Sequence, residues 1–172
     1  MTGLQTDYDV IVVGGGPSGA TAAHEMAQAG RSVLLLERAF RIKPCGGAIP
    51  PCLLDEFNIP RSLLKAEIQS ARMISPTRQK VDMPIEGTFV GMVDRDEFDP
   101  WLRDRAEQAG ATVAIGAFKA LNYRDDGSIR VSYVAKDEDQ ELIHATARCV
   151  LGADGARSKV ARLGIPNHAD VP

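Results

Sequence analysis

The stretch that decides the fold is Asp9-Val-Ile-Val-Val-Gly-Gly-Gly-Pro-Ser-Gly19. Its apolar part, Val10 to Val13, is short and β-branched, which is typical of a strand buried on both faces of a parallel sheet. The glycines Gly14, Gly16 and Gly19 follow in G-x-G-x-x-G spacing. The pattern predicts a strand, a tight turn and a helix that begins within the glycine segment.

This succession suits the binding of a dinucleotide. The first glycine permits the tight turn, the second lets a pyrophosphate approach the backbone, and the third allows close packing of helix on strand. Pro17 suits the first helical position, where a missing N–H costs nothing, and Gly30 suits the position just past the end. The N-terminus of such a helix offers N–H groups and a partial positive charge to a phosphate.

A second strand is predicted at Ser32 to Glu37, and it ends in a carboxylate. Glu37 stands 18 residues beyond Gly19, where its carboxylate can accept hydrogen bonds from both hydroxyls of an adenosine ribose. An acidic residue here repels a 2′-phosphate and disfavours NADP at this site, although the neighbouring Arg38 could favour it. FAD and NAD both fit this motif, and a plain glycine turn with a surface glutamate is the alternative.

A second glycine motif follows a predicted strand at Cys149 to Leu151. It reads Gly152-Ala-Asp-Gly-Ala-Arg-Ser158. Gly155 lets a ligand reach the backbone, and the Asp154 carboxylate can accept a hydrogen bond from a hydroxyl such as that of a ribityl chain, which favours FAD. The alternative is that Asp154 only caps the helix expected from Ser158 to Leu163.

Together with these motifs, the pattern of the remaining sequence predicts an α/β nucleotide-binding domain whose sheet is crossed by a small antiparallel layer. Prolines bracket two adjacent glycines in Lys43 to Pro50, so no regular element is expected there. We expect strands at Ile68–Ser75, Val81–Ile85, Phe89–Val93 and Thr112–Ile115, a helix from Asp94 or Asp96 to about Ala109, and a three-stranded meander over Ala117–Arg148. The predicted segments are 1–39, the first β-α-β unit; 40–93, the glycine-rich loop and inserted strands; and 94–172, the continuation of the domain.

Composition narrows the function classes. The 172 residues include 20 basic and 23 acidic side chains, a net charge of −3, and only 5 Phe, 3 Tyr and 1 Trp, so nucleic acid is a poor partner. Three cysteines without CxxC spacing fit neither a disulfide framework nor a zinc site. No run of 18 apolar residues occurs, which leaves only surface contact with a membrane open. His24, among polar neighbours in the first helix, is expected to be solvated.

The motifs together resemble the geranylgeranyl reductases of chlorophyll and bacteriochlorophyll synthesis, FAD-dependent enzymes built like para-hydroxybenzoate hydroxylase. The resemblance runs from Tyr8 to about Gly164. The two glycine motifs are shared by the wider flavoprotein group, whereas the segment Lys43-Pro-Cys-Gly-Gly-Ala-Ile-Pro50 is much more specific to the reductases. The resemblance rests on these three motifs, on Glu37, and on two further segments, Met73-Ile-Ser-Pro76 and Gly91-Met-Val-Asp-Arg-Asp-Glu-Phe98.

The resemblance implies an enzyme that uses FAD and NADPH to reduce a geranylgeranyl chain to phytyl. Its substrate would be geranylgeranyl diphosphate or geranylgeranyl-(bacterio)chlorophyll, and its place the cytoplasm or the surface of a photosynthetic membrane. Ser18 and Glu37 would touch the ADP half of FAD, Arg95 the flavin side, and Asp154 an element serving FAD and NADPH. The full set of implied cofactor-binding residues is Gly14, Gly16, Pro17, Ser18, Gly19, Glu37, Arg38, Cys45, Gly46, Gly47, Arg95, Asp154 and Gly155.

Several alternatives stay open at this point. Cys45, beside the isoalloxazine, would be either the proton donor or a small polarizable wall. A flavin monooxygenase of the same fold and an inactive flavin-binding fragment are the rival functions. Members of the resembled family continue past the position of Pro172 through a second flavin motif, a substrate-binding sheet and further helices, so we expect this chain to be an N-terminal part that binds FAD weakly and shows no turnover alone. The number of double bonds reduced and the oligomeric state are also open.

Overall fold

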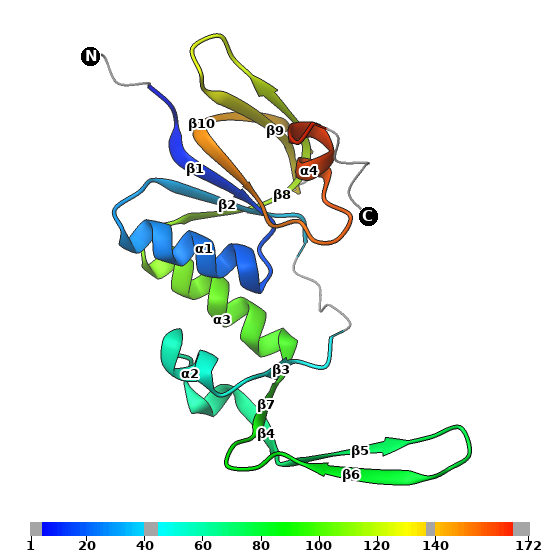
Figure 1. The fold of residues 1–172 in the computed structure, drawn as a ribbon. Helices are drawn as coiled ribbons and strands as arrows, with labels where there is room; N and C mark the ends of the chain where they lie inside the picture. Colours follow the sequence, from blue (N-terminus) through cyan, green and yellow to red (C-terminus); the bar gives the residue numbers. More distant parts are fainter. Residues whose placement is uncertain (1–4, 40–44, 137–139, 167–172) are drawn as a thin grey trace. The chain divides into compact units, whose positions relative to one another are not determined.

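Five strands of the first structural unit pair in a closed ring, in the order β1-β10-β9-β8-β2 (Figure 1). The computed structural model describes residues 5–39, 45–136 and 140–166. It divides into one unit of Met1–Phe40 and Asp99–Pro172 and a second of Arg41–Phe98. The first unit holds β1 (Tyr8–Val13), α1 (Pro17–Gln28), β2 (Val33–Glu37), most of α3 (Arg95–Gln108), β8 (Thr112–Tyr123), β9 (Ile129–Ala135), β10 (Leu142–Gly152) and α4 (Lys159–Gly164).

The ring combines a parallel and an antiparallel layer. Strands β8, β2, β1 and β10 pair in parallel, whereas β9 pairs antiparallel with both β8 and β10. This confirms the expected α/β fold with an antiparallel meander. The separate strand expected at Thr112–Ile115 is instead the first part of β8, because the chain runs on without a turn from its pairing with β2 into its pairing with β9.

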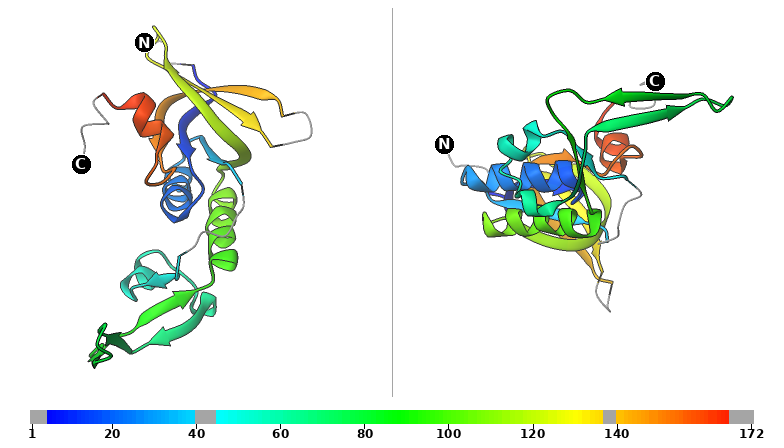
Figure 2. Two further views of the ribbon diagram at one scale, coloured as in Figure 1. Left: turned by 90° about the vertical axis from the view of Figure 1, so that its right-hand side faces the viewer. Right: turned by 90° about the horizontal axis from the view of Figure 1, so that it is seen from below.

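The core lies between the two layers of the ring. Alternate residues of β1 and β2, such as Ile11 and Leu34, face Phe118, Val131 and Tyr133 of the meander. The opposite face of β1 and β2 packs against α1, whose Ala20, Ala23 and Ala27 are all buried. Helix α4 packs on β8 and β10 (Figure 2). Small alanine side chains let α1 approach the strands closely, so the end of β1 and the start of α1 are fixed together.

His24 shows that the outer face of α1 is also covered. Its side chain is only 5% exposed, and its Nδ1 lies 3.1 Å from the carbonyl oxygen of Arg105 in α3. The expectation that His24 is solvated is therefore wrong. Its polar sequence neighbours indicated solvent, but the packing of α3 beside α1 is a tertiary contact that local sequence does not encode.

The second unit contains the inserted strands. A three-stranded sheet has the order β3-β7-β4, and β5 and β6 form a separate hairpin. The bounds are β3 (Ala48–Ile49), α2 (Cys52–Glu56), the 3₁₀ turn η1 (Arg61–Leu63), β4 (Leu64–Ile68), β5 (Ser70–Ile74), β6 (Lys80–Pro84) and β7 (Val90–Val93). The segment Lys43 to Pro50 does contain a short regular element, β3, because Ala48 pairs with Met92. Lys43 and Pro44 lie outside the described residues.

The β5–β6 hairpin has one polar and one apolar face. On the polar face Arg72 donates to Asp82 through Nε (2.6 Å) and Nη2 (3.0 Å). The cross-strand pair Met73 and Val81 lies on the other face, where these side chains are 60% and 59% exposed. The strand expected over Ile68–Ser75 corresponds to β5, except that its first residue, Ile68, ends β4, which belongs to a different sheet.

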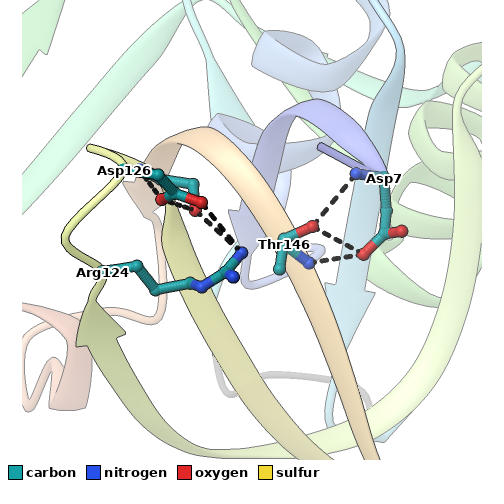
Figure 3. Close-up of polar contacts among 5 residues, drawn as sticks. Asp7, Arg124, Asp126 and Thr146 are labelled. Carbon is teal, nitrogen blue, oxygen red and sulfur yellow. Dashed lines mark hydrogen bonds and ion pairs between the residues drawn. The ribbon is translucent and has the colours of Figure 1, made fainter. Parts of the chain in front are cut away.

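Thr146 on β10 holds the start of β1 in register (Figure 3). Its backbone N–H and hydroxyl both donate to the Asp7 carboxylate, at 2.7 and 2.8 Å, and the Asp7 N–H donates back to its hydroxyl. These hydrogen bonds lower the pKa of Asp7 below its ordinary value. The folded state therefore favours the ionised carboxylate, a stabilisation that is present above the ordinary pKa and is lost as pH falls through the lowered one.

We predict that Thr146→Val lowers the melting temperature at pH 7 by roughly 2–4 °C, because it removes the hydroxyl from this exposed network. The deficit should shrink at pH 3, which lies below the ordinary pKa of an aspartate, because the stabilisation is lost as pH falls toward the lowered pKa of Asp7. Thermal denaturation followed by circular dichroism at both pH values measures the effect. Thr146→Ser keeps the hydroxyl and serves as control, and an equal deficit in both variants would contradict the prediction.

Candidate cofactor-binding site

The two glycine motifs meet at the carboxyl ends of β1 and β10. Val13 pairs with Gly152 in the parallel register, and the Ala153 N–H donates to the Val13 carbonyl oxygen at 2.7 Å. Gly14 has φ +110°, and a Cβ there would overlap the Ala153 carbonyl oxygen. Both the backbone angle and the close approach therefore demand glycine at the first position of the motif.

The start of α1 is built against the same turn. A Cβ at Gly19 would overlap the Gly14 carbonyl oxygen and come within 3.1 Å of the Ala153 Cβ. Gly16 is the N-cap in extended conformation, Pro17 follows it at the start of the helix, and among the described residues no side chain caps this helix. The exposed Ser18 lies in the first turn. The uncapped helix start leaves N–H groups of its first turn available to an anion.

Glu37 reaches from the end of β2 to the glycine loop. Its Oε2 accepts from the Gly15 N–H at 2.7 Å, and its Oε1 accepts from the Ala39 N–H at 3.1 Å. Each carboxylate oxygen has a further lone pair, so ribose hydroxyls can be accepted as well. Arg38, next in the chain, is exposed. The predicted ribose-binding residue thus also fixes the loop that would bind the pyrophosphate.

Asp154 caps α4, as the alternative interpretation proposed. Its carboxylate accepts from the Ser158 hydroxyl, from the Lys159 N–H at 2.6 Å and from the Val160 N–H at 3.3 Å. Asp154 is partly buried, and its neighbour Gly155 is exposed with φ +89°. The cap and a ligand contact are compatible, since two carboxylate oxygens offer about four acceptor positions. Contact of Asp154 and Gly155 with a ligand remains a prediction.

The other predicted residues belong to the second unit. Gly47 is buried with φ +68°, its carbonyl accepts from the Val93 N–H at 3.0 Å, and a Cβ there would overlap the Val93 carbonyl oxygen. Gly47 is therefore needed for packing on β7. Gly46 has only the Met92 methyl carbon near its Cβ position, at 4.0 Å. Cys45 is exposed and Arg95 is half-buried, and their approach to a flavin stays a prediction.

Arg103 is the site residue that the sequence did not reveal. It is only 9% exposed, and its Nη1 donates to the Gly15 carbonyl oxygen at 3.1 Å. The sequence predicted only a helix here; within it Phe98, Leu102 and Ala106 are spaced four apart as an apolar stripe, and Arg103 follows Leu102. An arginine beside an apolar helix stripe usually indicates a solvated edge, so its burial beneath the loop follows only from the tertiary structure.

The geometry fits a dinucleotide. The described residues place a glycine turn, an uncapped helix start and the Glu37 carboxylate at one sheet edge, the usual ligand position in such sheets. Those residues contain no cluster of three or more His, Cys, Asp or Glu suited to a metal ion. Within the described part of the chain, no helix is both long enough and apolar enough to cross a membrane.

We predict that Gly19→Ala destabilises the chain by more than about 3 kcal/mol, because its methyl group has no room beside the Gly14 carbonyl. Gly30→Ala is the matched control. Gly30 has φ +75° but nothing within 4 Å of its Cβ position, so only backbone strain of about 1 kcal/mol is expected. Urea denaturation measures both, and equal losses would show that the close approach of α1 to the turn is not limiting.

Known proteins resemble this chain in sequence. A family model described as FAD dependent oxidoreductase matches residues 9–155. A geranylgeranyl diphosphate reductase of Rhodobacter capsulatus is 56% identical over 153 residues, which cover 89% of this chain and 39% of that protein. The chloroplastic geranylgeranyl diphosphate reductase of Arabidopsis thaliana is 39% identical over 165 residues, covering 89% of this chain and 35% of that protein. The chain thus spans about two fifths of the length of the curated relatives it matches.

Solved structures show the same fold. A geranylgeranyl bacteriochlorophyll reductase-like protein from Thermoplasma acidophilum superposes with a TM-score of 0.75 at 30% identity, covering 86% of this chain and 39% of that one. The p-nitrophenol 4-monooxygenase of Pseudomonas putida has a TM-score of 0.74 at 19% identity, covering 92% of this chain and 43% of that one, and this likeness concerns the fold alone. Because the family model covers most of the sequence, from β1 to the second glycine motif, the chain belongs to the FAD dependent oxidoreductase family.

Proposed function

We propose that this chain forms the FAD-binding part of an enzyme that uses NADPH to reduce a geranylgeranyl chain to phytyl. The observation that carries the proposal is the meeting of Gly14, Gly19, Glu37 and Ala153 at one sheet edge. The 56% identity to a geranylgeranyl diphosphate reductase narrows the flavoprotein class to this chemistry. Geranylgeranyl diphosphate is the first substrate to test, and the pigment ester at a membrane surface is the second.

The residues of the first unit would bind and orient the cofactor. The N–H groups at the start of α1 would hold the pyrophosphate, and the Glu37 carboxylate would hold the adenosine ribose. The Asp154 carboxylate would accept a hydrogen bond from a hydroxyl of the ribityl chain while it also caps α4. Bound FAD supplies the capacity to accept hydride from NADPH and pass it to carbon. The chain itself contributes alignment, which in such reactions lowers the barrier by fixing the reacting atoms close together.

Cys45 belongs to the loop that the resemblance places beside the flavin ring. Reduction of an isolated double bond needs a proton on one carbon and hydride on the other, with water excluded from the reacting chain. The exposed Cys45 thiol could deliver that proton or merely border the ring. We favour the second role, since a solvent-facing thiol also suits a wall residue of a pocket completed by other parts of the enzyme.

A flavin monooxygenase is the rival activity, and solved monooxygenases share the fold. Their identity to this chain, 19% for the p-nitrophenol enzyme, supports no common chemistry. The reductase relatives reach 56%, 39% and, for the digeranylgeranylglycerophospholipid reductase of Thermoplasma acidophilum, 32% identity. These identities favour reduction of a prenyl chain over hydroxylation with oxygen.

A chimera tests the proposed function. We would join this chain to the part of the Rhodobacter capsulatus relative that lies beyond the matched region. We expect a flavin absorption band that survives gel filtration and NADPH oxidation that depends on geranylgeranyl diphosphate. The 172-residue chain alone should bind FAD weakly and show no turnover. Consumption of oxygen with hydroxylated product, or failure of the chimera to retain FAD, would refute the proposal.

The same chimera separates the two roles of Cys45. We expect Cys45→Ala and Cys45→Ser to keep turnover within about threefold of the parent, because a wall residue tolerates a small replacement. A lost general acid would instead lower turnover by about 10²-fold or more. Cys52→Ala, at another exposed cysteine, is the matched control. A large loss in both Cys45 variants with FAD still bound would establish the donor role.

A further inference from the structure

Both peptide groups that flank Gly15 are held by buried or half-buried side chains. The Gly15 N–H donates to Glu37 Oε2 at 2.7 Å, and the Gly15 carbonyl accepts from Arg103 Nη1 at 3.1 Å. The two side chains also pack on Gly15 itself: a Cβ there would lie 2.9 Å from the Glu37 Cβ and 3.3 Å from the Arg103 Cδ. Residue 15 thus has little freedom to rotate.

The bond from Arg103 fixes more than the carbonyl it touches. The Gly15 carbonyl and the Gly16 N–H belong to one planar trans peptide unit, in which the two groups point in opposite directions. Holding the carbonyl toward α3 therefore turns the Gly16 N–H away from α3. Gly16 is the second glycine of the motif, the position at which a pyrophosphate approaches the backbone.

The charge of Arg103 adds to this orientation. A hydrogen bond from a guanidinium is stronger than one from a neutral donor, and it polarises the peptide group that accepts it. The Gly16 N–H consequently becomes a better donor to an anion. A buried cation beneath the loop also favours a negatively charged ligand on the other side of it, where the low local polarity of the protein screens the charge weakly.

We propose that Arg103 is a positioning residue for the diphosphate of the cofactor, acting through the Gly15–Gly16 peptide. The inference rests on the proposed binding of FAD at this loop. Arg105 provides the matched comparison, because it lies on the same helix but its guanidinium is 3.9 Å from Glu25 and 5.4 Å from the centre of the Trp101 ring. Arg103 contacts the loop through its bond to the Gly15 carbonyl oxygen.

Three variants, R103M, R103K and R105M, test the proposal with ADP and adenosine as probes in calorimetry. We expect R103M to bind ADP about tenfold more weakly than the wild-type chain while its adenosine affinity stays unchanged, because adenosine lacks the diphosphate. R103K retains the cation and should stay within about threefold for ADP, and R105M should match the wild type. Equal losses for ADP and adenosine in R103M, or an ADP affinity equal to that of R105M, would overturn the proposal.

Amide exchange in the wild-type chain gives a result that does not depend on how the variants fold. We expect the Gly15 N–H to be protected from exchange before any ligand is added, and the Gly16 N–H resonance to shift when ADP binds. Because the Gly15 N–H bonds to Glu37, its protection reports on the Glu37 side of the loop. The Gly16 N–H belongs to the peptide that Arg103 holds, and the absence of a shift at Gly16 on ADP binding would overturn the inference. If the wild-type chain binds neither ADP nor FAD, the proposed function fails, whereas equal ADP affinity of R103M and the wild-type chain overturns only the role of Arg103.

Discussion

The close approach of three backbone segments at the end of β1 is the constraint on which the first unit depends. The turn at Gly14, the start of α1 at Gly19 and the peptide at Ala153 occupy space that side chains would otherwise fill. Packing of this density tolerates no added atoms without movement of the backbone. The same contact that closes the core also brings both glycine motifs to one edge of the sheet, so stability and the proposed cofactor binding depend on the same residues.

The long strands β8 and β10 explain how this edge is kept rigid. Each strand pairs in parallel with β1 or β2 at one part of its length and antiparallel with β9 at another. In the ring that results, each of the five strands has two partner strands. The meander therefore stabilises the parallel layer, and the hydrogen bond between Thr146 and Asp7 holds the start of β1 against β10.

Sequence patterns predicted the elements that local physics determines. The apolar run before Gly14, Pro17 at the helix start and Gly30 just past the helix end each need only neighbouring residues to specify them. Contacts between distant segments escaped prediction: the burial of His24, the pairing of β3 with β7 and the position of Arg103 all depend on a helix or strand tens of residues away. Asp154 was predicted as a ligand residue with helix capping as the alternative. The sequence could indicate the cap because its partner Lys159 lies only five residues away.

The net charge of the chain is negative, whereas the groups around part of its glycine loop are positive. The chain carries a formal charge of −3, yet its glycine loop is faced by an uncapped helix start and backed by the buried Arg103 guanidinium. The Glu37 carboxylate lies beside the same loop and accepts from the Gly15 N–H. A ligand that places a diphosphate over the helix start and hydroxyls beside the carboxylate satisfies both charges at once. Such alternation, rather than overall charge, fits the proposed dinucleotide better than a simple anion, because a lone phosphate would bring no hydroxyl donor to the carboxylate.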